Sequence, residues 1–157
     1  MRIAIDADPA GYELKVAIVK HLEEKGVDFV DFAPEQEKVR DIYETVPDMM
    51  PLIQKGEFDF GILICGTGMG MSQIANSYKG IRAALCESVY TAKLCRAINN
   101  SNVLCLGGFI VAPWMANAMV DVFLSTNITE EESLASVKDF LLDLDCKVKE
   151  LDEQIYK

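Results

Sequence analysis

Histidine is nearly missing from this chain of 157 residues, because His21 is the only one. It falls within a predicted helix, where we expect a structural role facing solvent rather than acid–base chemistry. No apolar run approaches the ~20 residues that a membrane-spanning helix requires. No signal peptide precedes the first predicted strand, which begins at Arg2. These absences favour a cytoplasmic protein that does not contact a membrane.

Paired cysteines are missing as well. The five cysteines, Cys65, Cys86, Cys95, Cys105 and Cys146, are odd in number and scattered, and no two have CxxC spacing. This usage is typical of reduced thiols and supports neither a disulfide framework nor a zinc site. We expect Cys86, Cys95 and Cys105 to be buried as small hydrophobic residues. We also expect no metal and no cofactor.

Positive charge is scarce. The chain has 15 lysines and arginines against 25 aspartates and glutamates, a formal net charge of −10. With no basic run, this balance excludes a nucleic-acid-binding surface. The acidic residues gather toward the C-terminus, beginning with Glu130, Glu131 and Glu132, and fit a solvated helix face.

Apolar periodicity alternates between strand and helix patterns along the chain. Predicted strands cover Arg2–Asp6, Val27–Phe32, Phe60–Cys65, Ile81–Cys86 and Val103–Leu106. Predicted helices cover Tyr12–Lys25, Ile42–Lys55 (interrupted by Pro47 and Pro51), Met69–Ser77, Val89–Ile98, Ala112–Leu124 and Glu131–Tyr156. This alternation predicts an α/β fold: a single Rossmann-like domain over residues 1–157, with three α-β-α layers around a five-stranded parallel sheet.

The last predicted helix is long for so small a domain. Its apolar residues recur every three or four positions: Leu134, Val137, Leu141, Leu144, Val148, Leu151 and Ile155. Such a stripe needs a packing partner. We expect residues 129–157 to pack on another subunit, in a homodimer or homotetramer. The alternative is that the helix folds back on its own chain.

The segment Gly61–Ser72 is the most informative part of the sequence. An apolar run delivers Cys65 to the end of a predicted buried strand, and glycines follow at positions 66, 68 and 70 before a helix. In a parallel sheet, ligands bind at the carboxyl ends of the strands. A glycine-rich turn there exposes backbone N–H groups that bind negative charge, and it would stabilise a Cys65 thiolate. We therefore predict a functional site at this turn.

Two other glycine motifs fit this turn less well. A P-loop is excluded, because no lysine–hydroxyl pair follows Gly70. A dinucleotide fingerprint has some support, since Glu87 ends the next strand about 20 residues later. Against it, Gly70 comes one residue too early for G-x-G-x-x-G, and the turn follows the third strand rather than the first.

Residues 64–72, Ile-Cys-Gly-Thr-Gly-Met-Gly-Met-Ser, resemble the active-site loop of a known family. This family contains type-B ribose-5-phosphate isomerase and the galactose-6-phosphate isomerase subunits. The resemblance extends from Met1 to about Leu124. It includes the strand-end segment 6–11, Gly80-Ile81-Arg82-Ala83-Ala84, the segment 96–104 (similar to Arg-x-His-Asn), and Gly107-Gly108.

The resemblance implies an aldose–ketose isomerase that moves a proton between adjacent carbons of a sugar phosphate through an enediolate. It matches Cys65 with the base and Thr67 with a residue that assists ring opening. It assigns the anion hole to Gly66, Gly68, Met69, Gly70 and Met71, which would stabilise the enediolate oxygen. It places Asp8 and Asn99 where the family holds sugar hydroxyls.

The sequence departs from the family at the residues that bind the substrate phosphate and open the sugar ring. Ile98 stands in place of the ring-opening histidine, and Pro9 replaces the histidine that often follows the strand-end aspartate. The region that carries phosphate-binding arginines is acidic here, in residues 129–136. Arg40, in the loop after the second strand, could still reach a ligand. We expect Arg82 and Arg96 to be structural.

Two functions remain open from the sequence. The chain is either an isomerase for a sugar or sugar phosphate whose anionic group is bound differently, or a non-catalytic or half-site subunit of a heteromeric isomerase with a homologous chain. The intact Cys65 loop favours the first function. The missing histidine and arginines favour the second. An open-chain substrate would not need the missing histidine.

Overall fold

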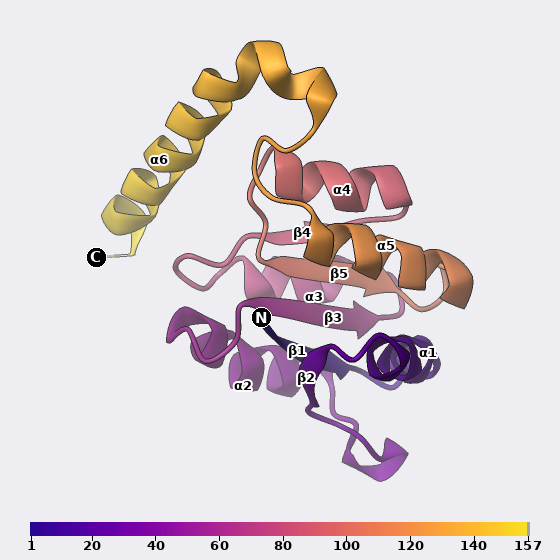
Figure 1. Ribbon diagram of the computed structural model, residues 1–157. Helices are drawn as coiled ribbons and strands as arrows, with labels where there is room; N and C mark the ends of the chain where they lie inside the picture. Colours follow the sequence, from indigo (N-terminus) through magenta and orange to yellow (C-terminus); the bar gives the residue numbers. More distant parts are fainter. Residues whose placement is uncertain (157) are drawn as a thin grey trace.

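The computed structural model describes residues 1–156 as a parallel β-sheet covered by helices on both faces (Figure 1). The strands are β1 (Arg2–Ala7), β2 (Asp28–Asp31), β3 (Phe60–Cys65), β4 (Ala83–Leu85) and β5 (Val103–Gly107). They lie in the order β2-β1-β3-β5-β4, and each neighbouring pair is parallel. The predicted α/β fold with five parallel strands is therefore confirmed.

The helices are α1 (Tyr12–Glu24), α2 (Ile42–Gln54), α3 (Met69–Ala75), α4 (Val89–Ala97), α5 (Pro113–Ser125) and α6 (Lys138–Ile155). Short 3-10 turns cover Gln36–Lys38 and Glu132–Val137. Among the helices of the described chain, none is long and apolar enough to cross a bilayer.

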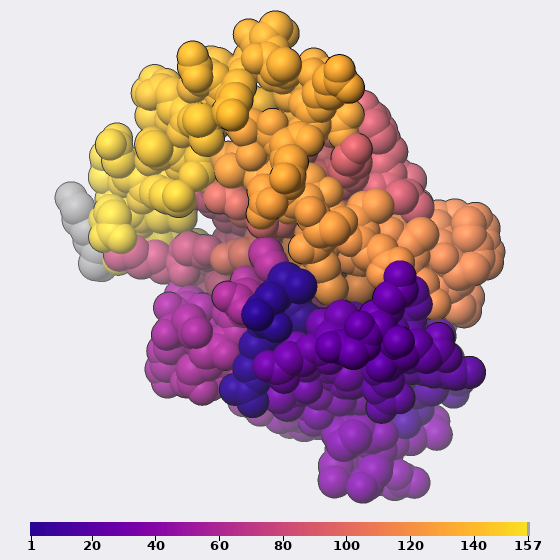
Figure 2. All heavy atoms as spheres, in the orientation of Figure 1, coloured from indigo at the N-terminus to yellow at the C-terminus, as the bar shows by residue number. Residues whose placement is uncertain are grey.

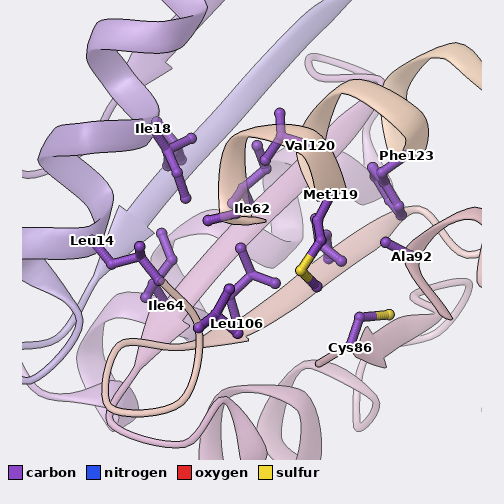
Figure 3. Close-up of a cluster of buried hydrophobic side chains, with 14 of the residues drawn as sticks. Leu14, Ile18, Ile62, Ile64, Cys86, Ala92, Leu106, Met119, Val120 and Phe123 are labelled. Atoms are coloured by element: carbon purple, nitrogen blue, oxygen red, sulfur yellow. The ribbon is translucent and has the colours of Figure 1, made fainter. Parts of the chain in front are cut away.

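The apolar faces of the strands build two cores, one on each side of the sheet. Alternate strand residues such as Ile62 and Ile64 pack against α1, α4 and α5 (Figure 3). The residues between them, such as Leu63 and Cys65, face α2 and α3 on the other side. Because side chains alternate along a strand, each strand residue belongs to a definite face. Cys65 is thereby assigned to the α2–α3 face.

Three elements differ in detail from the sequence predictions. The helix α2 runs through Pro47 and Pro51 without a break, because the buried side chains of Val46, Met49 and Met50 hold it on the sheet. β4 is shorter than predicted, and it is an edge strand with a single neighbour. The predicted C-terminal helix is regular only from Lys138, because a 3-10 segment precedes it.

His21 is a further correction. We expected this side chain to face solvent, but only 14% of it is exposed. Its Nε2 atom lies 2.8 Å from the Oδ1 atom of Asp121 on α5. The residue therefore links α1 to α5 through a structural interaction, away from the turn at Cys65.

The C-terminal segment forms an arm along one side of the molecule (Figure 2). Within α6, only Leu141 is buried, while Leu144, Leu151 and Ile155 stay exposed. The predicted apolar stripe is thus present but largely unpacked in a single chain. A second exposed apolar group lies at the end of β5 and the start of α5: Phe109, Ile110 and Trp114.

Candidate active site

The candidate site lies where the direction of the chain across the sheet reverses. The connection from β1 leads outward to β2, whereas β3 lies on the other side of β1. The helices that follow β1 and β3, α1 and α3, lie on opposite faces of the sheet. In open parallel sheets this arrangement leaves a crevice at the carboxyl ends of the two central strands. Asp8 follows β1 and Cys65 ends β3, so both lie at this crevice.

Three loops meet there at close range. Gly108 N–H donates to the carbonyl of Cys65 at 2.7 Å, and Asp8 N–H donates to the carbonyl of Ile64 at 3.0 Å. A Cβ atom on Gly108 would lie 2.6 Å from the carbonyl oxygen of Ala10, so only glycine allows these backbones to approach this closely. The loops after β1, β3 and β5 therefore form one surface around Cys65.

The Cys65 thiol is held by the turn that follows it. The residue is 5% exposed, and the backbone N–H of Gly68 donates to its Sγ atom at 3.1 Å. Gly68 has φ +78°, in the left-handed region that glycine adopts without strain, and it is the N-cap of α3. This hydrogen bond fixes the sulfur against the backbone of the turn.

The same turn presents further backbone donors. Among the described residues, no backbone carbonyl accepts a hydrogen bond from the N–H groups of Thr67, Gly70 or Met71. Met69 N–H lies 3.4 Å from the Thr67 hydroxyl, and both side chains are exposed, whereas Met71 is fully buried. Free N–H groups at the start of a helix form a site for a developing oxyanion. The structure thus brings together the cysteine and the loop donors identified in the sequence.

Asp8 lies close to Cys65, but one oxygen of its carboxyl group already accepts hydrogen bonds within its own loop. Its Oδ1 atom accepts hydrogen bonds from the N–H groups of Ala10 and Gly11, each at 2.9 Å. Partial burial raises the pKa of its carboxyl, and the nearby charge of Asp41 acts in the same direction. Its second oxygen is free of such bonds among the described residues, so Asp8 can still accept from a ligand hydroxyl.

Arg40 lies at this edge too, before the start of α2. The adjoining Ile42 packs against the turn, since a Cβ atom on Gly70 would lie 2.7 Å from its Cδ1 atom. The Arg40 guanidinium donates to Asp48 on α2, and its NH2 atom lies 3.8 Å from the Oδ2 atom of Asp6. With 34% of its side chain exposed, Arg40 is partly open to solvent at this edge.

Asp6 is a neighbour of the site that the sequence interpretation missed. It is 1% exposed, and burial raises the pKa of its carboxyl to about 6. Its Oδ1 atom accepts from the N–H of Ala7, while its buried Oδ2 atom has no hydrogen-bond partner in the described chain. A charged residue at an inward position of the apolar run Ile3–Ala7 was the available signal.

Asn99 is not brought to Cys65 within one chain. It is exposed after α4, at the amino end of the strands, where Asn102 accepts from the N–H of Gly61 at the start of β3. Gly61 and Cys65 are four residues apart on β3, or about 13 Å at the usual strand rise. The two predicted site residues thus lie on opposite edges of the sheet.

Two further polar clusters lie at the amino edge. Arg82 is bound to Asp145 of α6 and to the carbonyl of Asn99, and Arg96 is buried between the rings of Phe60 and Phe123. A hollow of about 570 Å³ opens between this edge and α6, and Arg82 and Arg96 line it. No group of three or more potential metal-ligating residues occurs within the described part of the chain.

These features define a class of protein: an α/β fold that presents a thiol and backbone donors at the switch point of a parallel sheet. The chain belongs to the Ribose/Galactose Isomerase family, whose model matches residues 3–140. The resemblance read from the Cys65 loop is thereby confirmed.

Individual relatives cover the whole chain. It is 41% identical over 160 residues to the 4-deoxy-4-sulfo-D-erythrose isomerase of Clostridium sp. (strain MSTE9), covering 100% of this chain and 99% of that protein. It is 37% identical over 149 residues to the ribose-5-P isomerase B of Listeria innocua, covering 94% and 99%. The solved structure of Clostridium thermocellum ribose-5-phosphate isomerase B superposes with a TM-score of 0.86 at 32% identity, over 100% of both chains.

Proposed function

We propose that this protein interconverts the aldose and ketose forms of a short sugar that ends in an anionic group, using Cys65 as the base. The observation that carries the proposal is the buried Cys65 thiol with the Gly68 N–H 3.1 Å from its sulfur, beside free loop donors. Relatives named as isomerases of a sulfonated tetrose and of a phosphorylated pentose support this substrate class.

In the proposed reaction, the Cys65 thiolate takes the proton from C2 of the open-chain aldose. The electron pair left on C2 forms the C1–C2 double bond, and the negative charge moves to O1. Free N–H groups of the turn, such as those of Gly70 and Met71, stabilise that oxygen. The thiol returns its proton to C1, and one hydroxyl proton passes from O2 to O1, which gives the ketose. Asp8 holds a substrate hydroxyl, and Thr67 lies beside the reacting carbons.

The missing histidine points to a particular length of substrate. A tetrose closes a five-membered ring only through its C4 hydroxyl, so a tetrose with phosphate or sulfonate at C4 stays open. Such a substrate needs no acid to open a ring. Ile98 in place of the family histidine is compatible with that chemistry. We therefore propose a C4-substituted tetrose as the preferred substrate.

A second copy of the chain completes the proposed site. Asn99 and Cys65 lie on opposite edges of one sheet, so Asn99 can hold a substrate hydroxyl only at the Cys65 turn of a partner. The exposed apolar residues of α6, such as Leu144 and Leu151, provide a surface for such contact. We propose a homodimer or a homotetramer built from it. A heteromer with a homologous chain is the alternative.

The test is turnover by the purified protein alone. We expect it to isomerise 4-deoxy-4-sulfo-D-erythrose or D-erythrose 4-phosphate, with ribose 5-phosphate a poorer substrate. Cys65→Ala is expected to lower kcat by at least about a thousandfold, because removal of the base leaves no group to accept the carbon-bound proton. Unchanged turnover in Cys65→Ala would refute the mechanism.

Cys105→Ala is the matched control, because this thiol is buried on β5 two residues before the strand ends, and among the described residues no backbone N–H donates to its sulfur as Gly68 does to Cys65. It should keep kcat within about threefold. If the pure protein is inert toward every substrate and gains activity only on mixing with a homologous chain, the half-site function is correct instead.

A further inference from the structure

Arg40 lies between two carboxylates, one exposed to solvent and the other buried. Asp48 lies on α2 with 57% of its side chain exposed, and it accepts a hydrogen bond from the guanidinium. Asp6 lies at the end of β1 with 1% exposed, and its Oδ2 atom is 3.8 Å from the other terminal nitrogen of Arg40. The exposed partner can be exchanged for water or for a ligand, whereas the buried partner cannot.

Asp6 and the thiol share one face of the sheet. Asp6 is opposite Leu63 in the β1–β3 register, and Leu63 and Cys65 point to the same side because they are two residues apart. At the usual strand spacing and rise, the Cα atoms of Asp6 and Cys65 are about 8 Å apart. Arg40 is thus anchored on the residue next to the candidate base.

A carboxylate in this position is costly for the fold. A buried charge is normally paired and hydrogen-bonded, yet Oδ2 of Asp6 has no hydrogen-bond donor among the described residues. The charged groups around it are Arg40 before α2, Lys15 on α1 and Asp31 on β2. Lys15 already binds Asp31 at 2.7 Å, so Arg40 is the cation left to face Asp6.

We propose that Asp6 is the positioning residue for Arg40, and that Arg40 so held binds the anionic end group of the substrate at the Cys65 site. The proposal rests on the isomerase function proposed above. The anionic group of the substrate would replace Asp48 as the hydrogen-bond partner of the exposed guanidinium nitrogen. Asp6 would stay beside the other nitrogen and hold the Arg40 side chain in position. Asp48 then competes with the substrate for the Arg40 guanidinium, whereas Asp6 holds that guanidinium in position.

The two carboxylates therefore give effects of opposite sign. If both acted only through their charge, neutralising either one would strengthen the binding of an anion. Under the proposal, Asp48→Asn strengthens binding, because the competitor is gone. Asp6→Asn weakens it, because Arg40 loses its buried anchor. Asp48→Asn is the matched control, since it removes the same charge from the same guanidinium.

The experiment measures KM and kcat of the purified protein for 4-deoxy-4-sulfo-D-erythrose and for neutral 4-deoxy-D-erythrose, which also cannot close a ring. Arg40→Gln should raise KM for the sulfonate about 10- to 100-fold, with kcat changed less than about threefold. Asp6→Asn should raise it about fivefold, and Asp48→Asn should lower it about threefold. None of the three should change KM for 4-deoxy-D-erythrose by more than about twofold.

The double variant Asp6→Asn/Arg40→Gln should bind the sulfonate no more weakly than Arg40→Gln alone, because Asp6 affects binding only through the position of Arg40. A pH series adds a second readout, since a sulfonate has no pKa of its own near neutrality. KM of the native protein should rise below about pH 6, where Asp6 takes up a proton, and this rise should vanish in Asp6→Asn.

Two results would overturn the proposal. If Asp6→Asn lowers KM as Asp48→Asn does, Asp6 acts only through its charge. If Arg40→Gln leaves KM unchanged, the anionic group binds elsewhere, although Cys65-dependent turnover can still hold.

A binding measurement tests the proposed Arg40 subsite independently of the isomerase function. Calorimetry with 4-phospho-D-erythronate, a stable acid, on the Cys65→Ala protein needs no turnover. The same order of affinities (Asp48→Asn above the parent, Asp6→Asn and Arg40→Gln below it) supports the Arg40 subsite even if catalysis fails. Equal affinities in all four proteins overturn it.

Discussion

One polar cluster at each edge of the sheet, around Asp145 at the amino edge and around Asp6 at the carboxyl edge, shows an opposite state. At the amino edge, Arg82 is bound to Asp145, and Lys149 binds the same carboxylate at 2.7 Å. These contacts lower the pKa of Asp145, although its burial acts against them. At the carboxyl edge, Asp6 is buried with a raised pKa, and loop donors such as the Gly70 N–H lack backbone acceptors.

The difference separates polar groups that stabilise the fold from groups kept available for chemistry. Satisfied ion pairs at the amino edge hold α6 against the domain. Unsatisfied groups at the carboxyl edge cost stability, and such costs concentrate at functional sites. The hollow of about 570 Å³ lies at the amino edge, between Arg82, Arg96 and α6. The comparison can be tested at both edges.

Gly68→Ala should have the largest effect on stability. A Cβ atom there would lie 2.5 Å from Leu85 Cδ1 and 3.0 Å from the Leu106 carbonyl carbon, at φ +78°. Left-handed strain and overpacking together should lower the free energy of unfolding by about 3–4 kcal/mol. The displaced N–H should also leave the Cys65 sulfur and reduce kcat. Urea denaturation and steady-state kinetics check both.

Gly26→Ala is the control for this variant. It has φ +67° at the end of α1, with nothing within 4 Å of the added Cβ. Only the conformational cost applies, about 1 kcal/mol, and kcat should not change. Equal losses in both variants would mean that the close packing around Gly68 contributes nothing.

Asp6→Asn should make the protein relatively more stable as the pH rises. The pKa of Asp6 is about 6 in the folded chain and 3.8 when unperturbed, so the unfolded chain releases this proton first. Between pH 4 and 7 the native protein should lose about 2 kcal/mol relative to Asp6→Asn. Unfolding free energies measured at pH 4, 5, 6 and 7 give this difference. A pH-independent difference would show that Asp6 is not destabilised by its burial.

Arg82→Ala should have the smallest of these effects. It removes the bond to Asp145, a pair with only 16% and 9% of the side chains exposed, but Lys149 still binds that carboxylate. We expect a loss of about 1–2 kcal/mol and faster proteolysis of α6, with kcat within about threefold. The exposed pair Lys147–Asp143 is the control, where Lys147→Ala should leave the free energy of unfolding nearly unchanged. A large fall in kcat would show that Arg82, which also donates to the carbonyl of Asn99, supports the role proposed for Asn99 in the site of a partner.

The sequence was sufficient for the sheet and for the Cys65 turn. Buried parallel strands are continuous apolar runs, and the alternate glycines after Cys65 have few structural uses other than a tight, donor-rich turn. The sequence was insufficient for Asn99, because a family motif lists residues that need not come from one chain. It also missed Asp6, whose significance depends on a buried atom without a partner.

The C-terminal segment shows a second limit of prediction from the sequence. Helical spacing from Leu134 predicted one long helix, but the chain forms a 3-10 segment up to Val137 before α6 begins. Periodicity reports which residues would share a face, and it does not report whether anything covers that face. In this chain only Leu141 of the stripe is buried.

Trp114 on α5 is the only tryptophan of the chain, and 71% of its surface is open to solvent. The intrinsic emission of the protein therefore comes from one indole in water, close to Phe109 and Ile110 in the sequence. Whatever covers this part of the surface will shift that emission to shorter wavelengths. The molecule thus carries its own fluorescent reporter of association, with no label attached and no residue changed.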